Sequence, residues 1–262
     1  MNLIIKSEHV AERSIYPNTV FHFTDNIECL KSIIQSQYFK ASYAKEVIVG
    51  HNTKRTFGIP MVSFCDIRLS NLYEHMEKYG YYGIGLRKSW AINNGLNPVS
   101  YLNQKCSMFT YFDEQLREMS EELLDIKPLD EYKIAKSKYR NLLNVMRYMK
   151  NYEGELKRKN IYKKNYRYAN ESEWRYVPDI STNNVIPVKL IKENEPNWKD
   201  KANKHLSMSS SSRLGFDIKD IKYILIPGRS DTYDFIEHLA DDKNKIEIIS
   251  KIFDSSQIYK DL

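Results

Sequence analysis

Cysteine, glycine and long apolar runs are scarce in this sequence, and each shortage excludes a class of protein. Only three of the 262 residues are cysteine, at positions 29, 65 and 106, and no Cys-x-x-Cys pair occurs. Three widely spaced thiols do not suit the disulfide framework of a small secreted domain. No stretch of about 18 apolar residues is present, so we expect no membrane-spanning helix and no membrane partner. The short, polar amino terminus does not resemble a secretory signal, and these absences together predict a reduced, cytoplasmic protein.

The motifs that depend on glycine are missing as well. The nine glycines form neither a Gly-x-Gly-x-x-Gly turn after a predicted strand nor a Walker phosphate loop, so neither a Rossmann domain nor a P-loop NTPase is predicted. No Gly-x-Ser-x-Gly nucleophile elbow is present. Cys65, Asp66 and His75 do not have the spacing of zinc ligands. We therefore expect no metal site, and we interpret Cys65 as a small buried side chain.

What remains is enough apolar sequence for one folded domain. Hydrophobic residues make up 42% of the chain, and a net charge of +6 does not by itself imply nucleic acid binding. Short β-branched and aromatic runs mixed with amphipathic segments predict a single α+β domain over residues 1–262. Helical spacing of apolar residues over 113–126 and 129–152 predicts a helical insertion at about 111–152. We expect a long loop at 40–58, a strand at 185–191 and a polar linker at 192–213.

An acidic stretch late in the chain is the first candidate for a functional site. Residues 170–178 read Asn-Glu-Ser-Glu-Trp-Arg-Tyr-Val-Pro. As a strand they would place Glu171, Glu173 and Arg175 in one row, because strand side chains alternate with a period of two. Neighbouring carboxylates repel, and in a cleft such a pair suits proton abstraction, ribose binding or stabilisation of an oxocarbenium-like transition state. The alternative is an exposed strand with solvated charges.

The segment just before it, residues 150–168, is basic and rich in tyrosine. Seven Lys and Arg residues are interleaved there with four tyrosines. Lys163, Lys164, Tyr166 and Arg167 lie nearest the acidic stretch and are the candidate substrate-binding residues, because cations neutralise phosphates and aromatic rings stack on bases. The alternative is a solvated charged face.

Four short motifs carry a resemblance to a known family. They are Phe-His-Phe-Thr at 21–24, Ile-Pro-Met-Val-Ser-Phe-Cys-Asp-Ile at 59–67, Tyr-Gly-Tyr-Tyr-Gly-Ile-Gly-Leu at 79–86 and Glu-Ser-Glu-Trp-Arg-Tyr at 171–176. With them the chain resembles the AbiGi-like abortive-infection (phage resistance) family, densely over 20–102 and 168–178. The resemblance implies a role in antiviral defence. Some members of that family are described as antitoxins beside a nucleotidyltransferase toxin, so a cognate toxin or antitoxin is an expected partner.

The order of the motifs is also similar to that of ADP-ribosyltransferases. Those enzymes begin their site with a His-x-Thr strand and end it with a late strand carrying a catalytic Glu, often as Glu-x-Glu. Here His-Phe-Thr at 22–24 precedes Glu-Ser-Glu at 171–173, although Phe23 stands where one subclass has Gly. The resemblance implies an ADP-ribosyltransferase-like fold with a split mixed or antiparallel sheet. It also implies an enzyme that uses NAD as its substrate, without a metal.

The same resemblance implies which residues would hold NAD. His22 and Thr24 would bind the ribose on the nicotinamide side, and Tyr82 or Tyr43 would stack on the nicotinamide. Arg175 lies beside the acidic residues and is counted with this group.

The resemblance assigns the chemistry to the two glutamates. Glu173 would hydrogen-bond the ribose 2′-hydroxyl and stabilise the transition state, and Glu171 would orient or deprotonate the acceptor. The acceptor would be a macromolecule held by the basic segment, with RNA or DNA favoured over protein.

Two other interpretations remain open. One is a non-enzymatic antitoxin or interaction protein on a degenerate transferase fold. The other is a metal-dependent nuclease that uses Asp66, His75, Glu171 and Glu173.

Overall fold

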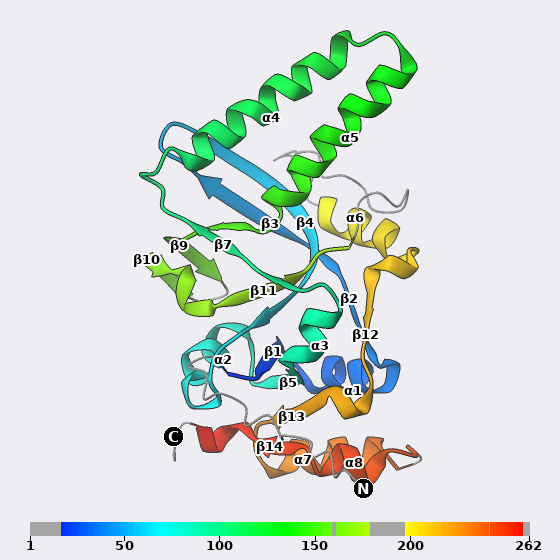
Figure 1. Ribbon diagram of the computed structural model, residues 1–262. Helices are drawn as coiled ribbons and strands as arrows, with labels where there is room; N and C mark the ends of the chain where they lie inside the picture. Colours follow the sequence, from blue (N-terminus) through cyan, green and yellow to red (C-terminus); the bar gives the residue numbers. More distant parts are fainter. Residues whose placement is uncertain (1–16, 159–160, 179–196, 241, 259–262) are drawn as a thin grey trace, which may run out of the picture.

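An eight-stranded sheet runs through the computed structural model, which describes residues 17–158, 161–178, 197–240 and 242–258 (Figure 1). Seven strands follow the order β14-β13-β5-β1-β4-β11-β6, and β3 pairs with β4. The strands are β1 Thr19–Thr24, β3 Ser42–Val49, β4 Lys54–Cys65, β5 Tyr82–Arg87, β6 Asn97–Pro98, β11 Glu173–Tyr176, β13 Ile221–Ile226 and β14 Ile252–Asp254. Every pair is antiparallel except β13 with β14.

The long strand β4 connects the β3–β4 hairpin with the rest of the sheet. Its first part pairs with β3 in a hairpin whose register runs from Ser42 opposite Met61 to Val49 opposite Lys54, and its last part lies between β1 and β11. The predicted loop at 40–58 is therefore wrong. Tyr43 and Ile48 are both buried, and because they are five residues apart they lie on opposite faces of β3 and belong to two different apolar clusters.

Helices pack around the part of the sheet that contains β1, β5, β13 and β14 (Figure 1). They are α1 Ile27–Ser36, α2 Tyr73–Tyr79, α3 Lys88–Asn93, α7 Arg229–His238 and α8 Lys245–Ile249. The Asn26 side chain caps α1 by accepting a hydrogen bond from the Cys29 N–H at 2.8 Å. Buried Lys31 of α1 pairs with Asp234 of α7 at 2.8 Å, which ties these helices together. The largest apolar core lies between the sheet and helices α1, α3, α7 and α8, whereas Met76 of α2 belongs to a smaller cluster.

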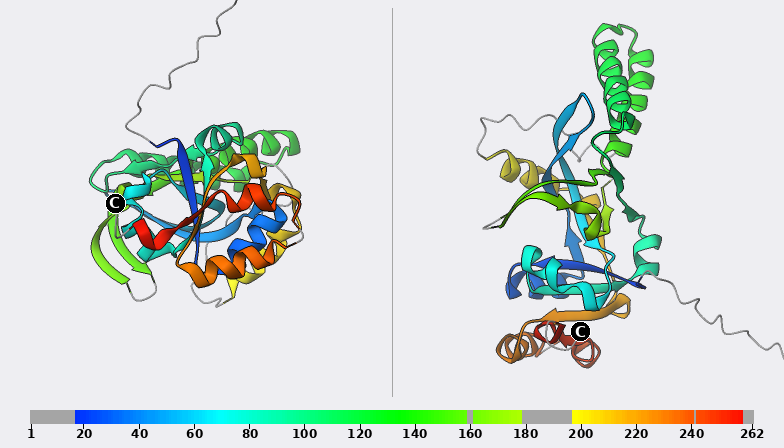
Figure 2. Two further views of the ribbon diagram at one scale, coloured as in Figure 1. Left: turned by 90° about the horizontal axis from the view of Figure 1, so that it is seen from below. Right: turned by 90° about the vertical axis from the view of Figure 1, so that its left-hand side faces the viewer.

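A helical hairpin rises from the other end of the sheet (Figures 1 and 2). It consists of α4 Met108–Asp125 and α5 Leu129–Met146, so the predicted helical insertion is present and begins three residues earlier than expected. The second helix ends at Met146, not 152, because β8 (Met149–Asn151) pairs in parallel with β7 (Ser100–Leu102). The base of the hairpin packs on β3 and β4 through Leu116 and Leu143.

Smaller elements complete the described chain. A two-stranded ribbon is formed by β9 (Glu153–Arg158) and β10 (Ile161–Arg167), and β2 (Tyr38–Lys40) pairs with β12 (Arg213–Gly215). The predicted linker contains a helix, α6 (Trp198–Ser207), that packs on β3, and the predicted strand at 185–191 lies outside the described residues. Within the described ranges, no helix combines the length and apolar character needed to cross a membrane. The expected mixture of helix and sheet is observed, and the ADP-ribosyltransferase-like assignment remains a prediction.

Candidate functional site

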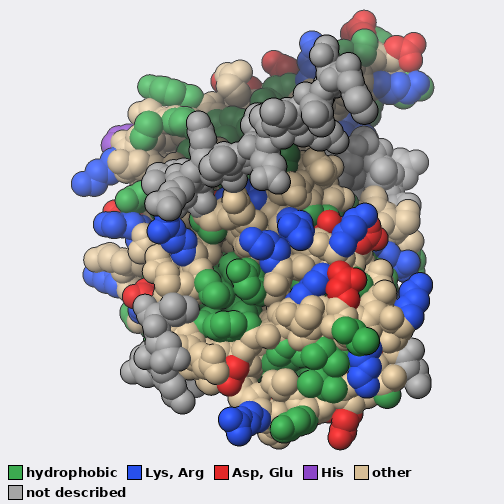
Figure 3. Space-filling view, turned by 60° about the horizontal axis from the view of Figure 1, so that its bottom comes forward, with side chains coloured by type: hydrophobic (Ala, Val, Ile, Leu, Met, Phe, Trp, Pro, Cys, Tyr) green, Lys and Arg blue, Asp and Glu red, His purple; other side chains and the backbone are tan. Residues whose placement is uncertain are grey.

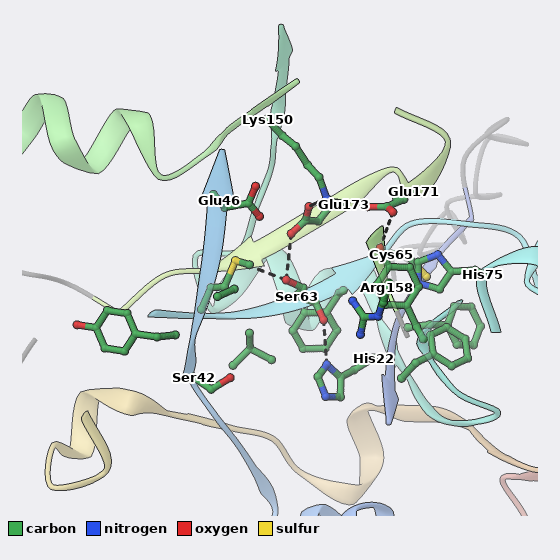
Figure 4. Close-up of a pocket in the computed structure, with 18 of the residues that line it drawn as sticks. His22, Ser42, Glu46, Ser63, Cys65, His75, Lys150, Arg158, Glu171 and Glu173 are labelled. Carbon is green, nitrogen blue, oxygen red and sulfur yellow. Dashed lines mark hydrogen bonds and ion pairs between the residues drawn. The ribbon is translucent and has the colours of Figure 1, made fainter. Parts of the chain in front are cut away.

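A cavity of about 440 Å³ lies where β1, β3, β4 and β11 come together (Figure 4). Its lining includes four residues predicted from the sequence, namely His22 of β1, Tyr43 of β3, Glu171 at the end of a 3-10 turn, and Glu173, the first residue of β11. They meet because β4 lies between β1 and β11 in the sheet. The tertiary structure thus brings the early histidine and the late carboxylates, about 150 residues apart in sequence, to one cavity.

Glu173 is fully hydrogen-bonded inside the protein. It is 5% exposed. Its Oε1 accepts hydrogen bonds from Ser63 Oγ at 3.0 Å and Arg175 Nε at 2.6 Å, and its Oε2 accepts from Lys150 Nζ at 2.8 Å and Arg175 Nη2 at 3.0 Å. A carboxylate has about four acceptor positions, so all of them are occupied. Burial alone would raise the pKa of Glu173, but Lys150 and Arg175 outweigh it and hold this pKa far below its usual range.

Arg175 supports the carboxylate from behind the cavity. It is completely buried, and it is not among the described residues that line the cavity. Besides Glu173 it donates to Glu46 Oε1 at 2.9 Å and to the Arg147 carbonyl oxygen at 2.8 Å. Burial raises the pKa of Glu46, although the two cations Arg175 and Lys150 act in the opposite direction. Arg175 was predicted to help hold NAD, but its side chain is buried and hydrogen-bonded to other groups of the protein.

Lys150 connects the two predicted glutamates. Its Nζ lies 2.8 Å from Glu171 Oε2 and 2.8 Å from Glu173 Oε2, and the Tyr79 hydroxyl donates to Glu171 Oε1. Burial alone would lower the pKa of Lys150, but the carboxylates raise it well above its usual value. Glu171 ends a 3-10 turn and Ser172 has a φ of 42°, so the expected continuous strand over both glutamates is wrong. A shared lysine, and not strand alternation, holds the carboxylates together.

His22 is held at the side of the cavity by the Ser63 carbonyl group of β4 and by aromatic rings. Its Nδ1 lies 2.9 Å from the Ser63 carbonyl oxygen, and its ring lies 4.9 Å from that of Phe39 and 5.5 Å from that of Phe64, between centroids. Burial lowers the pKa of His22. The lowered pKa favours the neutral imidazole, whose Nδ1–H can donate to the Ser63 carbonyl oxygen.

Of the other residues predicted to contact the nicotinamide side of NAD, Tyr43 lines the cavity, whereas Thr24 and Tyr82 do not. Thr24 lies opposite Tyr82 in the pairing of β1 with β5, and the Tyr82 hydroxyl donates to Asp231 of α7 at 2.6 Å. Neither Thr24 nor Tyr82 is among the described residues lining the cavity. Tyr43 does line it, and its backbone N–H donates to Asn203 of α6 at 2.8 Å. Tyr43 is thus the tyrosine of the two that is placed to contact a ligand there.

The predicted substrate-binding residues lie on the β9–β10 ribbon. Lys163, Lys164 and Arg167 are exposed, whereas Tyr166 is buried. The Arg167 guanidinium lies over the Tyr152 ring at 5.6 Å, so the ribbon's own cations cover part of its aromatic surface. Binding of RNA or DNA to this ribbon remains a prediction.

Four residues that complete the site were not predicted in this role. Lys150 was grouped with the basic segment, Glu46 fell in the expected loop, and Ser63 and Tyr79 belonged to motifs used only for the family resemblance. Arg158 also reaches the cavity, where its guanidinium lies 4.1 Å from the centre of the Tyr79 ring (Figure 4). No signal in the sequence joins these five positions, because they come from five separate elements, β8, β3, β4, α2 and β9.

Metal binding finds no support in the described part of the chain. No group of three or more His, Cys, Asp or Glu side chains is placed to hold a metal ion there. Asp66, a member of the proposed nuclease set, pairs with Lys88. Cys65 is 1% exposed, as expected for a small core side chain, and burial raises its pKa well above its usual value.

Comparison with known proteins supports the family resemblance. A family model described as "Putative abortive phage resistance protein AbiGi, antitoxin" matches residues 28–227. A protein of Lactococcus lactis subsp. cremoris named "Abortive phage resistance protein AbiGi" is 29% identical over 264 residues, which cover 92% of this chain and 97% of that protein. No solved structure matches. Neither description mentions an ADP-ribosyltransferase. Because the family model spans more than half of the sequence, this chain belongs to the AbiGi family of abortive phage resistance proteins.

Proposed function

We propose that this protein is the antitoxin of an abortive-infection pair, which restrains a cognate toxin by binding it and catalyses no reaction itself. The description of the family names an antitoxin, and the relative from Lactococcus is named for abortive phage resistance. Both fit the non-enzymatic interpretation of the sequence better than the transferase interpretation.

The observation that carries the proposal is the saturation of Glu173. A glutamate that holds a ribose hydroxyl and stabilises a developing positive charge needs an acceptor position facing its substrate. Glu173 receives four hydrogen bonds from Ser63, Lys150 and Arg175. These bonds tie β11 to β4 and β8, which is a structural role. A buried ion-pair network of this kind holds strands in register and provides no free base.

A growth assay tests the proposal directly. The chain is expressed alone and together with the product of the reading frame adjacent to its own in the source genome. We expect no effect of the chain alone and restored growth where the adjacent product arrests growth. Glu171→Gln preserves the shape of the side chain and should restore growth as well as the wild type. Growth arrest by the chain alone, or failure to restore growth, contradicts the proposal.

A second candidate function is transfer of ADP-ribose from NAD, because His22, Glu171 and Glu173 line one cavity. In that reaction Glu173 would have to release one of its four hydrogen bonds before it could hold the ribose of NAD. Arg158 and Tyr43, which also line the cavity, would then contact the ligand.

Radiolabelled NAD separates the two candidates. The purified protein is incubated with NAD labelled in its ADP-ribose part, together with RNA, DNA or cell lysate. The antitoxin proposal expects no labelled macromolecule. Label transfer by the wild type that Glu173→Gln abolishes, in a variant that melts like the wild type, would replace the antitoxin by the transferase.

A further inference from the structure

The outer part of the helical hairpin has no buried core of its own. We call residues 117–142 the arm; the structure describes all of them, and none is buried. The buried residues of α4 end at Leu116, and those of α5 begin at Leu143. Figures 1 and 2 show the arm standing clear of the sheet. The arm is thus anchored at its base, and beyond the base its two helices contact each other.

The end of the arm exposes large aliphatic side chains. Leu124 is 85% exposed, Leu129 66% and Ile134 60%. They lie in the last turn of α4 and the first turns of α5. Single exposed apolar residues are normal, but several at the end of one projecting element are typical of an interaction site. Covering these three side chains would remove apolar surface from water, which favours association.

The same end carries more carboxylates than cations in a basic protein. Residues 118–136, which include all three aliphatic side chains, contain six carboxylates and three lysines, a net charge of −3, whereas the whole chain carries +6. Asp130 pairs with Lys133, and Glu121, Glu122 and Asp125 form no ion pair within the described residues. In Figure 3 acidic and apolar side chains lie together with basic ones at the end of the arm, at the upper right. A surface of this composition repels nucleic acid and attracts a basic protein surface.

We propose that the end of the arm is the toxin-binding site, and that it inserts into a groove of the toxin with an apolar floor and lysine and arginine at its rim. This assignment rests on the proposed antitoxin function and adds the surface that performs it. Leu124, Leu129 and Ile134 fill the groove, and Glu121 and Glu122 pair with its rim. Charge complementarity selects the toxin over nucleic acid, and it speeds the encounter of the two proteins.

Calorimetric titration tests the assignment with full-length proteins. The probe is the product of the adjacent reading frame, as in the growth assay. Two arm variants, Glu121→Lys with Glu122→Lys and Leu124→Ser with Ile134→Ser, are compared with Glu74→Lys plus Glu237→Lys. This control reverses two exposed acidic residues on α2 and α7 and changes the net charge equally. The melting temperature of each variant is measured to verify folding.

Each arm variant should bind the toxin about tenfold more weakly than the wild type, and the control about twofold at most. Wild-type affinity should fall between 50 and 300 mM salt, as expected for screened surface charges. Wild-type binding that the arm variants leave unchanged, or that the control weakens equally, overturns the arm assignment alone. A dimer of this chain that the arm variants dissolve overturns it in favour of a second copy. Absence of wild-type binding and of restored growth overturns the antitoxin function as well.

Discussion

Removing the Lys150 ammonium group should destabilise the fold, and the loss should depend on pH. Lys150→Met keeps most of the side-chain volume but leaves Glu171 and Glu173 without the cation that lies 2.8 Å from each. Both carboxylates are almost fully buried, and Arg175 contacts only Glu173 of the two. The variant therefore contains a buried, uncompensated negative charge.

The magnitude follows from measurements on buried ion pairs. Removing one partner of such a pair costs about 3–5 kcal/mol in unfolding free energy. For 262 residues, an unfolding entropy of about 2.1 cal/mol/K per residue converts this loss into a melting temperature about 5–9 °C lower.

The pH dependence has a definite sign. The folded pKa of Glu173 is lowered, so its contribution to wild-type stability is present above the unfolded value of about 4.3 and is lost as pH falls through the folded value. In Lys150→Met, protonation of the glutamates relieves their repulsion. The gap in melting temperature between wild type and variant should therefore be smaller at pH 4.5 than at pH 7.5.

Thermal denaturation at both pH values, with two controls, completes the experiment. Lys150→Arg retains the charge and should lose less stability than Lys150→Met. Lys157→Met removes an exposed lysine of β9, whose side chain is 70% exposed, and should leave the melting temperature unchanged. A Lys150→Met protein as stable as the wild type at pH 7.5, or one with an equal deficit at pH 4.5, would refute the ion-pair reasoning.

Three further outcomes are expected from single changes. Asp113 is completely buried and accepts hydrogen bonds from three side chains at the base of the hairpin, so Asp113→Asn should lower the unfolding free energy by about 3 kcal/mol in urea denaturation. Gly80 has a φ of 111°, and an added Cβ would come within 2.2 Å of the Thr24 carbonyl oxygen. Gly80→Ala should therefore cost about 2–3 kcal/mol, against about 1 kcal/mol for Gly95→Ala, where the positive φ of 72° faces open space. Burial lowers the pKa of His75 to about 4, so its ring should titrate near pH 4 by NMR. The unfolded value is about 6.5, and the folded protein should lose stability as pH falls from 6.5 towards 4. His75→Phe should make this slope smaller, and buried His22, whose pKa is also lowered, contributes to the part that remains.

Local periodicity predicted some elements well and others poorly. The strand around His22 was recognisable because it is rich in β-branched and aromatic residues. The hairpin near 111–152 was recognisable because its apolar residues repeat at helical spacing over several turns. The β3–β4 hairpin was not, because the buried residues of β3, Tyr43 and Ile48, lie on opposite faces and are separated by the charged Lys45 and Glu46, so they form no period-two pattern. The helix at Trp198–Ser207 was interpreted as a linker, since it is short and buries only Leu206.

In the candidate site, too, the sequence predicted some of the interacting residues and missed others. The sequence indicated that Glu171 and Glu173 repel each other and placed Arg175 in the same row, and Arg175 does pair with Glu173. The cation that joins both is Lys150. Lys157, Arg158, Lys163, Lys164 and Arg167, which follow it in the same basic segment, are exposed, so composition grouped Lys150 with them. Burial, which only packing decides, turned the same ammonium group into the centre of an ion-pair network.

By itself, the sequence was sufficient to determine the family, the mixture of helix and sheet, and the residue types that gather late in the chain, because these depend on local order along the polymer. Only the tertiary structure decided that β4 lies between His22 and the glutamates, that Glu173 has no acceptor position left, and that the arm stands clear of the sheet. Each of these depends on contacts between segments far apart in the chain, whose pairing is set by the burial of apolar surface and by the desolvation of charge, which no local pattern encodes.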